Sequence, residues 1–260
     1  MAVPVGVHSP RLRRARALRS AKGRREQQRF AFEGPTLLEE ARTSSFPIEE
    51  IYATPEAYEA TELVREIERA GTPVYLVDPA GAKQLSDLAT PAGIVVVARP
   101  RLSARASIFG QNSPALVLAD LGDPANAGTL LRSADAFGCA GVVFGPLGVE
   151  PFHPKVVRGS MGAVFRLSIA IAQPDEVASA AALAGVRLLG LDARGEPFTG
   201  GTWERPAAVI VGHERQGLGR WEPFCDELVA IPMRGPAESL SAGVAGSIAL
   251  FEASRGRPRY

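Results

Sequence analysis

Five short apolar runs in the second half of the chain constrain its fold more than any other feature. They are nearly continuous rather than alternating with polar residues, helical segments separate them, and they span Ala115–Ala119, Gly141–Phe144, Val186–Leu191, Ala207–Val211 and Leu228–Ile231. Strands buried on both faces have this composition and belong to mostly parallel sheets covered by helices on both sides. The pattern predicts an α/β domain with a mostly parallel sheet over residues 115–260.

The first half predicts a smaller α/β domain over residues 1–98. Its β-rich runs are Phe30–Glu33, Ile48–Ala53, Val74–Val77 and Ile94–Val97, and segments of helical composition at Pro35–Arg42, Pro55–Ala70 and Ala80–Leu88 lie between them. Residues 99–114 contain two prolines, three serines and no sustained periodicity. We therefore expect residues 99–114 to form a linker between the two domains.

Residues 122–138 place a polar turn and a helix directly after the first apolar run of the second domain. Asp123 and Pro124 make the turn, and Asn126 stands where the N-cap of the helix is expected. Leu130, Ala134 and Phe137 predict the buried stripe, so Arg132 faces away from it. Open α/β sheets bind ligands at this edge, beyond the carboxyl ends of their strands.

Two later segments repeat the order of strand, glycine-containing turn and helix. Ala207–Val211 leads into Gly212-His213-Glu214-Arg215-Gln216-Gly217, and Leu228–Met233 leads through Gly235 to Ser239-Leu240-Ser241 and a helix of small residues. Glycine lets the backbone approach a ligand closely at little conformational cost. The three segments together predict one binding site.

The three segments resemble the three motifs of the SpoU branch of the SPOUT RNA methyltransferases, which methylate ribose 2′-hydroxyls with S-adenosylmethionine. Motif one is matched by Asn126, Gly128, Arg132 and Gly138, motif two by Gly212, Glu214 and Gly217, and motif three by Ile231-Pro232-Met233, Ser239 and Leu240. The resemblance implies a deep trefoil knot in the C-terminal domain. It implies S-adenosylmethionine as the cofactor.

The resemblance also implies roles for individual residues. The catalytic set it implies is Asn126, Arg132, Glu214, Ser239 and Ser241, and the cofactor-binding set is Gly212, Glu214, Gly217, Ile231, Met233, Ser239 and Leu240. Arg132 corresponds to an arginine proposed to draw the proton from the 2′-hydroxyl. Because a guanidinium stays protonated, an equally physical role is to clamp the phosphate beside the target ribose, with Glu214 fixing the Arg132 rotamer.

Motif three departs from the family at one position. The family usually has Ser-Leu-Asn there, and this chain has Ser239-Leu240-Ser241. A serine hydroxyl still donates and accepts hydrogen bonds, but it is shorter than a carboxamide and offers fewer of them. This departure motivates an alternative reading, in which the chain is a catalytically impaired RNA-binding or ribosome-assembly protein on the same fold.

A cluster of arginines near the N-terminus predicts a surface that binds RNA phosphates, although the net charge of the whole chain is only +1. The residues expected to bind RNA are Arg11, Arg13, Arg14, Arg16, Arg19, Arg24 and Arg25, with Arg158 and Ser160 from a later segment that resembles a substrate-contacting region of the family. Arg29–Gly34 and Leu37–Ala41 resemble the N-terminal substrate-binding domain of SpoU proteins that modify rRNA. A solvated basic helix remains the alternative for this stretch.

Several other classes of protein are disfavoured. Cys139 and Cys225 do not form a Cys-x-x-Cys pair, and the three histidines are scattered, so neither a disulfide scaffold nor a metal site is expected. No apolar run is long enough to span a membrane, and we expect an intracellular, cytoplasmic protein. The turn at Gly212 lacks the Lys-Ser/Thr of a P-loop, and no Gly-x-Gly-x-x-Gly predicts a Rossmann enzyme.

The leading hypothesis from the sequence is an S-adenosylmethionine-dependent 2′-O-ribose methyltransferase that acts on structured RNA. A separate RNA-binding domain favours large-subunit rRNA, and a tRNA substrate remains an alternative. Every nucleotide offers the same 2′-hydroxyl, so the motifs leave the modified base open, as well as a housekeeping or antibiotic-resistance role. The last helix, Leu240–Ser254, is rich in small residues and is expected either to pack in the core or to form half of a homodimer contact.

Overall fold

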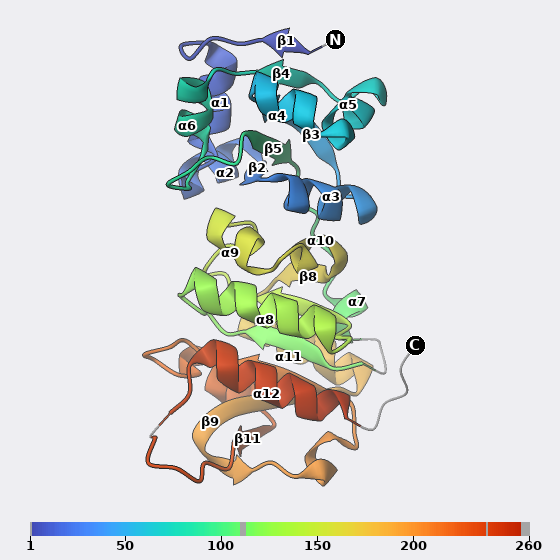
Figure 1. The fold of residues 1–260 in the computed structure, drawn as a ribbon. Coiled ribbons are helices and arrows are strands. Elements are labelled where there is room, and N and C mark those ends of the chain that lie inside the picture. Colours follow the sequence, from blue (N-terminus) through green and yellow to red (C-terminus); the bar gives the residue numbers. More distant parts are fainter. Residues whose placement is uncertain (1, 110–112, 238, 256–260) are drawn as a thin grey trace. The chain divides into compact units, whose positions relative to one another are not determined.

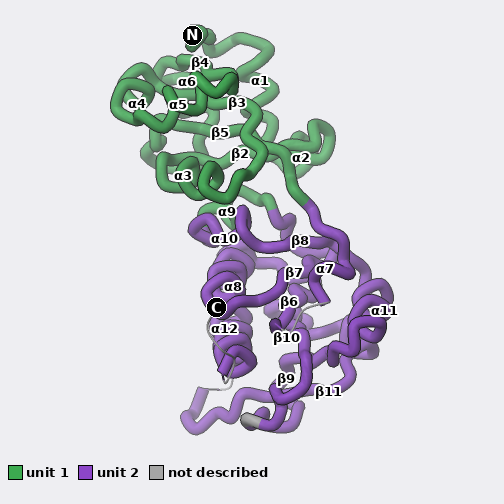
Figure 2. The backbone as a smooth tube through the Cα atoms, turned by 90° about the vertical axis from the view of Figure 1, so that its right-hand side faces the viewer, with its two compact units in different colours: residues 1–101, 152–158 green, residues 102–151, 159–260 purple. Residues whose placement is uncertain are grey.

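The computed structural model describes residues 2–109, 113–237 and 239–255. These residues form two compact units, one made of residues 1–101 and 152–158 and the other of residues 102–151 and 159–260 (Figure 2). Three residues of the predicted linker, 110–112, lie outside the described residues. Each unit is built around one sheet.

The first unit contains a five-stranded mixed sheet in the order β1-β4-β3-β5-β2. Its strands are β1 (Val3–Pro4), β2 (Phe30–Glu33), β3 (Ile48–Ala53), β4 (Val74–Leu76) and β5 (Ile94–Ala98). β5 is antiparallel to both β2 and β3, and the remaining pairs are parallel. The four predicted strands are confirmed, whereas the sequence reasoning missed the two-residue β1.

The helices of the first unit are α1 (Pro10–Ala17), α2 (Ala21–Gln27), α3 (Pro35–Thr43), α4 (Pro55–Ala60), α5 (Glu62–Arg69) and α6 (Pro79–Leu85), together with all but the last residue of α9 (Pro154–Gly159). The single helix predicted over Pro55–Ala70 is wrong, because Thr61 has extended backbone angles (φ −112°, ψ 95°) that end α4 and begin α5. Leu12 and Leu18 of α1 pack with Tyr52 and Tyr75 of the sheet in a buried core.

The second unit contains a six-stranded sheet in the order β11-β9-β10-β6-β7-β8. Its strands are β6 (Ala115–Leu118), β7 (Gly141–Phe144), β8 (Ser168–Ile171), β9 (Arg187–Pro197), β10 (Ala207–Val211) and β11 (Glu227–Ala230). Every neighbouring pair is parallel, which confirms the predicted sheet. The sequence reasoning missed β8, and the trefoil knot remains a prediction of the resemblance.

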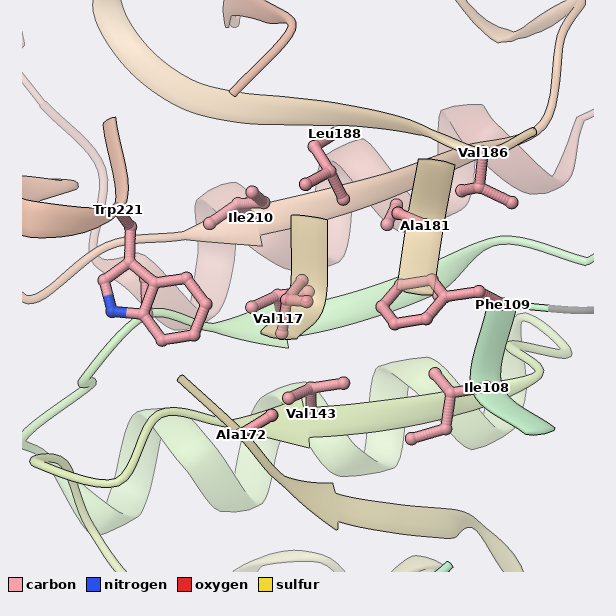
Figure 3. Packing of buried hydrophobic residues seen from close by; sticks show 14 of the residues in the cluster. Ile108, Phe109, Val117, Val143, Ala172, Ala181, Val186, Leu188, Ile210 and Trp221 are labelled. Carbon is pink, nitrogen blue, oxygen red and sulfur yellow. The ribbon is translucent and has the colours of Figure 1, made fainter. Parts of the chain in front are cut away.

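Helices cover both faces of this sheet. The helices of the second unit are α7 (Ala106–Phe109), α8 (Pro124–Ala136), α10 (Ala163–Arg166), α11 (Pro174–Ala184) and α12 (Ala242–Ser254), with 3-10 turns η1 (Gly200–Trp203) and η2 (Gly219–Phe224). On one face, α8 packs against α12 (Figure 1). On the other, α7, α11 and η2 enclose an apolar cluster in which Phe109 and Trp221 lie at opposite ends (Figure 3).

A close approach between α8 and α12 aligns their N-terminal ends. A Cβ atom on Gly246 of α12 would lie 2.4 Å from Cδ2 of Leu130 on α8 and 2.9 Å from Cγ2 of Val211 on β10. Only a glycine at this position lets the two backbones come so close. The tight contact sets the start of α12 beside the start of α8, where the predicted motifs lie.

Candidate functional site

Glu214 joins the turns that follow β6 and β10. Its carboxylate accepts hydrogen bonds from the backbone amides of Gly122 (3.1 Å) and Asp123 (3.0 Å) and from Nδ2 of Asn126 (2.9 Å). A carboxylate at the N-terminal end of a helix also interacts favourably with the helix dipole. Partial burial of Glu214 would raise its pKa, but these hydrogen bonds hold the pKa below its ordinary value, so the group is ionised at neutral pH.

Asn126 joins the same turns to the start of α12. Its Nδ2 donates to Glu214, and its Oδ1 accepts from the backbone amide of Gly243, at 3.3 Å. We call Glu214, Asn126 and the amides of Gly122, Asp123 and Gly243 the polar clasp. The clasp joins motifs one and two to the start of the helix that follows motif three.

The expected N-cap role of Asn126 is wrong. α8 begins at Pro124, and Asp123 is its N-cap, with a side chain that accepts from the amide of Ala125 at 2.9 Å. Proline is well suited to the first position of a helix because its φ is already helical and its missing N–H has no partner there. The helix therefore begins three residues earlier than expected, and the Asn126 side chain is available for the clasp.

Arg132 lies exposed on α8, as the helical pattern predicts. The expected pairing of Glu214 with Arg132 is not formed, because Asn126 and two backbone amides occupy Glu214 instead. Within the described part of the chain, Arg132 has no hydrogen bond or ion pair. Its guanidinium is accordingly available to an external anion.

A pocket of about 570 Å³ opens beside the polar clasp in the second unit. It is lined by all seven predicted cofactor-binding residues and by Asn126 and Ser241, but not by Arg132. Sequence reasoning missed the lining residues Leu191, Asp192, Ala193, Val211, His213, Val229, Ala230, Ala242 and Ala245. Asp192 could have been found from the sequence, because it directly follows the apolar run Val186–Leu191. The other turns that were predicted to form the site also follow predicted strands.

A bend in β9 brings Asp192 to the pocket. Leu189 and Gly190 pair with Glu227 and Leu228 of β11, and the next paired residues on β9 are Glu196 and Pro197. Residues 191–195 therefore bulge out of the ladder between these two pairings. Such a bulge re-aims side chains, and Leu191, Asp192 and Ala193 line the pocket.

The turn after β10 is closed tightly at its base. His213 and Gly217 exchange two backbone hydrogen bonds, of 2.8 and 2.9 Å, and a Cβ atom on Gly212 would lie 2.4 Å from the backbone of Gly217. Gly217 itself has a φ of +60°, a conformation that favours glycine. The turn thus offers backbone groups, rather than bulky side chains, to a ligand in the pocket.

Ser241 is the N-cap of α12, which begins at Ala242 rather than at Leu240. Its Oγ accepts from the amide of Val244 at 3.3 Å, and the residue also lines the pocket. Serine and asparagine are comparably good N-caps. The departure from the family motif therefore keeps the capping function of this position.

Asp120, which sequence reasoning did not select, fixes the backbone just before the clasp. It has a φ of +54°, and its carboxylate accepts from Nε of Arg220 (2.7 Å), Nε1 of Trp221 (2.8 Å) and the amide of Leu147 (3.0 Å). Partial burial alone would raise the pKa of Asp120, but the hydrogen bonds from Arg220, Trp221 and Leu147 lower it overall. Asp120 therefore anchors the loop after β7 and η2 to the end of β6.

The arginines predicted to bind RNA fall into two groups. Arg11 pairs with Glu50, Arg19 pairs with Asp87, and Arg24 is buried and donates to the carbonyl oxygens of Leu18 and Arg19. The second group, Arg13, Arg14, Arg16 and Arg25, is exposed and has no acidic partner among the described residues. Arg13 and Arg14 line a groove with Pro10, Ala17 and Gln27.

The segment predicted to contact substrate is also divided. Arg158 belongs to the first unit, where it lines a small cavity with Arg19 and Asp87. Ser160 is fully buried in the second unit, and its Oγ lies 3.5 Å from the amide of Val164. The expectation that Ser160 contacts RNA is therefore corrected, because its side chain is not accessible. Ser160 instead supports the local turn.

Two kinds of feature are absent from the described ranges 2–109, 113–237 and 239–255. No helix there combines the length and apolar character needed to cross a membrane. No group of three or more histidine, cysteine, aspartate or glutamate side chains there is arranged to hold a metal ion.

Two family models match the chain. A model of the SpoU rRNA Methylase family matches residues 113–251, and a model of the MRM3-like substrate binding domain matches residues 9–96. The first range contains the pocket and the polar clasp. The second contains both groups of N-terminal arginines.

Curated relatives match the chain over about half of its length. The 23S rRNA (uridine(2479)-2'-O)-methyltransferase of Streptomyces viridochromogenes is 36% identical over 147 residues, which cover 52% of this chain and 50% of the relative. An uncharacterized tRNA/rRNA methyltransferase of Mycobacterium ulcerans is 38% identical over 149 residues, which cover 55% of this chain and 48% of the relative. The matched part of the chain thus spans about half the length of these relatives.

Solved structures match both units. An rRNA methyltransferase from Sinorhizobium meliloti has a TM-score of 0.87 and 26% identity over 98% of each chain, and its AdoMet-bound form has a TM-score of 0.85 and 27% identity over 97% of this chain and 98% of that one. The SpoU methyltransferase AviRb from Streptomyces viridochromogenes, in complex with AdoMet, has a TM-score of 0.85 and 27% identity over 95% of this chain and 98% of that one.

Proposed function

This chain belongs to the SpoU rRNA methylase family, and from that premise we propose that it transfers a methyl group from S-adenosylmethionine to a ribose 2′-hydroxyl of large-subunit rRNA. A relative named as a 23S rRNA 2′-O-methyltransferase supports the choice of RNA. The observation that carries the proposal is the pocket, because residues of all three motifs line it and the polar clasp joins Asn126 of motif one to Glu214 of motif two beside it.

The pocket fits the cofactor in the character of its lining. Backbone groups of the closed Gly212–Gly217 turn, of Ile231 and Met233 and of Leu240 would hold it, and such groups bind a nucleoside without needing a charged side chain. S-adenosylmethionine supplies an activated methyl group for an in-line displacement. The contribution of the protein is then positioning, which is worth roughly 7–11 kcal/mol when the reacting groups are well oriented.

We assign Arg132 the role of clamping an RNA phosphate. It is exposed on α8, six positions after Asn126, and none of the described residues pairs with it. A guanidinium binds a phosphate with two parallel hydrogen bonds, which would fix the adjacent ribose. Proton abstraction by Arg132 is the less favoured role, because a guanidinium remains protonated in proteins.

The first unit is proposed to bind the RNA outside the site of methyl transfer, and the second unit to carry the catalytic site. The predicted boundaries of 1–98, 99–114 and 115–260 are adjusted in this proposal, because residues 102–109 of the predicted linker belong to the second unit and residues 152–158 to the first. Arg13, Arg14, Arg16 and Arg25 are the side chains assigned to this contact, because they are exposed and lack acidic partners among the described residues. Arg11, Arg19 and Arg24 are assigned structural roles instead.

A homodimer that packs through the second unit is part of the proposal. Val244 and Phe251 of α12 are 46% and 49% exposed, and they are seven residues, or about two helical turns, apart on one face. An exposed apolar stripe of this kind suits an isologous contact with a second copy. We place the activity in the cytoplasm, where rRNA is assembled into ribosomes.

Two measurements test the proposed function. Calorimetry with S-adenosylmethionine tests cofactor binding, and site-resolved mapping of ribose methylation in cells with and without the gene tests the reaction. One 2′-O-methyl mark in large-subunit rRNA should disappear with the gene. Cofactor binding without loss of any mark would favour the ribosome-assembly role, and loss of a mark in tRNA alone would reassign the substrate.

A further inference from the structure

Asp192 places a carboxylate in the pocket from the bulge of β9. Its side chain is only 16% exposed, and it lines the same cavity as the Gly212–Gly217 turn. The proposed reaction gives Asp192 no role. The hydrogen bonds around it leave one oxygen atom with spare accepting capacity.

The two oxygens of Asp192 are used unequally. Oδ1 accepts from the backbone amide and from Nε of Arg194, both at 2.9 Å, whereas Oδ2 accepts only from Nη2 of Arg194, at 2.9 Å, among the described residues. Each carboxylate oxygen has two lone pairs. Oδ2 is also the atom that a Cβ built on Gly217 would meet, at 4.0 Å. The open lone pair thus belongs to the oxygen that faces the Gly212–Gly217 turn.

The charge around Asp192 remains negative despite Arg194. Nη2 of Arg194 also donates to Glu222 at 2.8 Å, so one guanidinium serves two carboxylates and the group of three carries a net charge of −1. Arg194 is 65% exposed and therefore approaches Asp192 from the solvent side. The hydrogen bonds from Arg194 lower the pKa of Asp192, which keeps it ionised.

The rest of the pocket strengthens this negative character. Among the described residues that line it, none is lysine or arginine. Glu214, the other carboxylate of the lining, already accepts three hydrogen bonds from the clasp. Asp192 is therefore the acidic side chain of the lining that is best able to meet a positively charged ligand.

On the basis of the proposed function, we propose that Oδ2 of Asp192 interacts with the positive sulfonium of S-adenosylmethionine and so distinguishes the cofactor from its neutral demethylated product. The two molecules differ in the transferred methyl group and the formal charge on sulfur. A carboxylate near that charge favours the cofactor, and its attraction is lost once the methyl group leaves. Asp192 would thereby bind the cofactor and favour release of S-adenosylhomocysteine.

Calorimetric titration with S-adenosylmethionine and S-adenosylhomocysteine tests the proposal through binding alone. Asp192→Asn keeps the shape and removes the charge, and it should weaken S-adenosylmethionine binding about tenfold with a change in S-adenosylhomocysteine binding of less than about threefold. Arg194→Gln unmasks the carboxylate and should raise the preference for S-adenosylmethionine by about threefold. The two variants thus move the ratio of affinities in opposite directions.

Glu222→Gln is a further test of the charge argument, because it leaves Arg194 to pair with Asp192 alone and makes the group of three neutral, so the preference for S-adenosylmethionine should fall. Equal losses for both ligands in Asp192→Asn would overturn the proposal and indicate a contact with a part that the two ligands share, such as the α-ammonium group or the ribose hydroxyls. If Asp192→Asn does not fold, an unchanged or lower ratio in Arg194→Gln overturns it. Wild-type protein that binds neither ligand would overturn the proposed function as well.

Discussion

Single side chains hold the site together by bonding to the backbone of distant segments. Glu214 accepts hydrogen bonds from two backbone amides of the turn before α8. Asn126 accepts a hydrogen bond from the backbone amide of Gly243 at the start of α12. Asp120 does the same for the loop after β7. At this scale the groups divide into those whose hydrogen bonds are satisfied within the protein and those, such as Arg132, that remain open to a ligand.

Arg132→Lys should lower the rate of methyl transfer by about tenfold to a hundredfold, because lysine keeps the charge but replaces a bidentate contact with a single donor. Affinity for S-adenosylmethionine should stay within a factor of two, since Arg132 does not line the pocket. Single-turnover assays and calorimetry provide the two measurements. Arg105→Lys is the control, because Arg105 pairs with Glu176 away from the site. Turnover close to wild type would remove Arg132 from the reaction.

Asp120→Asn should destabilise the protein at neutral pH by about 1 to 3 kcal/mol, the typical cost of leaving a buried donor without its partner. Asparagine tolerates a positive φ, so the backbone conformation is retained. Asp135→Asn is the control, because Asp135 also pairs with an arginine but is 29% exposed, against 15% for Asp120.

The effect of Asp120→Asn should depend on pH with a defined sign. The folded protein lowers the pKa of Asp120 below its ordinary value of 3.8, so its ionised form stabilises the fold above that pH. This stabilisation is lost as the pH falls through the folded pKa. The difference in the free energy of unfolding between wild type and variant, measured with urea from pH 7 to pH 3, should therefore shrink below about pH 3.8. A difference that stays constant over this range contradicts the assignment.

At the scale of elements, the caps and contacts of two helices determine where the site forms. α8 begins at Pro124 because of its Asp123 cap, and α12 begins at Ala242 because of its Ser241 cap. Gly246 then allows the two helices to approach closely. These three features set Asn126 within hydrogen-bonding distance of Gly243.

Ser241 offers a test of this cap. Ser241→Ala should destabilise the protein by about 1 kcal/mol, because the amide of Val244 loses its acceptor, whereas Ser241→Asn should retain the wild-type stability. Thermal unfolding measures both. Ser241→Asn restores the side chain usual in the family, and we expect methyl transfer at least as fast as in wild type. A tenfold loss of activity would mean that the pocket has adapted to serine.

At the scale of the whole molecule, positive charge is concentrated in one small part of a nearly neutral chain. The net charge is +1, yet Arg13, Arg14, Arg16 and Arg25 lie close together in sequence on α1 and α2, and no described acidic side chain pairs with them. Such a local surface attracts RNA phosphates without making the entire protein a polycation.

Replacing Arg13, Arg14 and Arg16 with glutamine should weaken RNA binding and flatten its dependence on salt. Each lost phosphate contact lowers the slope of log affinity against log salt by about 0.7 to 0.9. The matched control replaces Arg11, Arg19 and Arg29, which pair with Glu50, Asp87 and Glu49, and its slope should change much less. Binding measured from low to high salt compares the two triple variants. Equal slopes in both would mean that the exposed arginines do not contact RNA.

The sequence alone determined the features that depend on neighbouring residues. Four of the five predicted strands of the second unit occupy nearly their predicted positions, because an apolar run of four or five residues is a local signal of a buried strand. β9 continues to Pro197 and bulges, and β8 was missed, since its run of four residues, Ser168–Ile171, begins with a polar residue. The three motifs were likewise readable in sequence, and residues from each of them line one pocket.

Only the tertiary structure decided which side chains meet. The bond between Asn126 and Glu214 joins residues 88 positions apart, and the bond between Asn126 and Gly243 spans 117 positions. No local pattern encodes such distances, because sheet order and helix packing determine them. The same holds for Asp192, which reaches the pocket through a bulge in β9, and for Ser160, which packing buries. Residue types therefore specified the chemistry available to this chain, and packing selected the groups that can perform it.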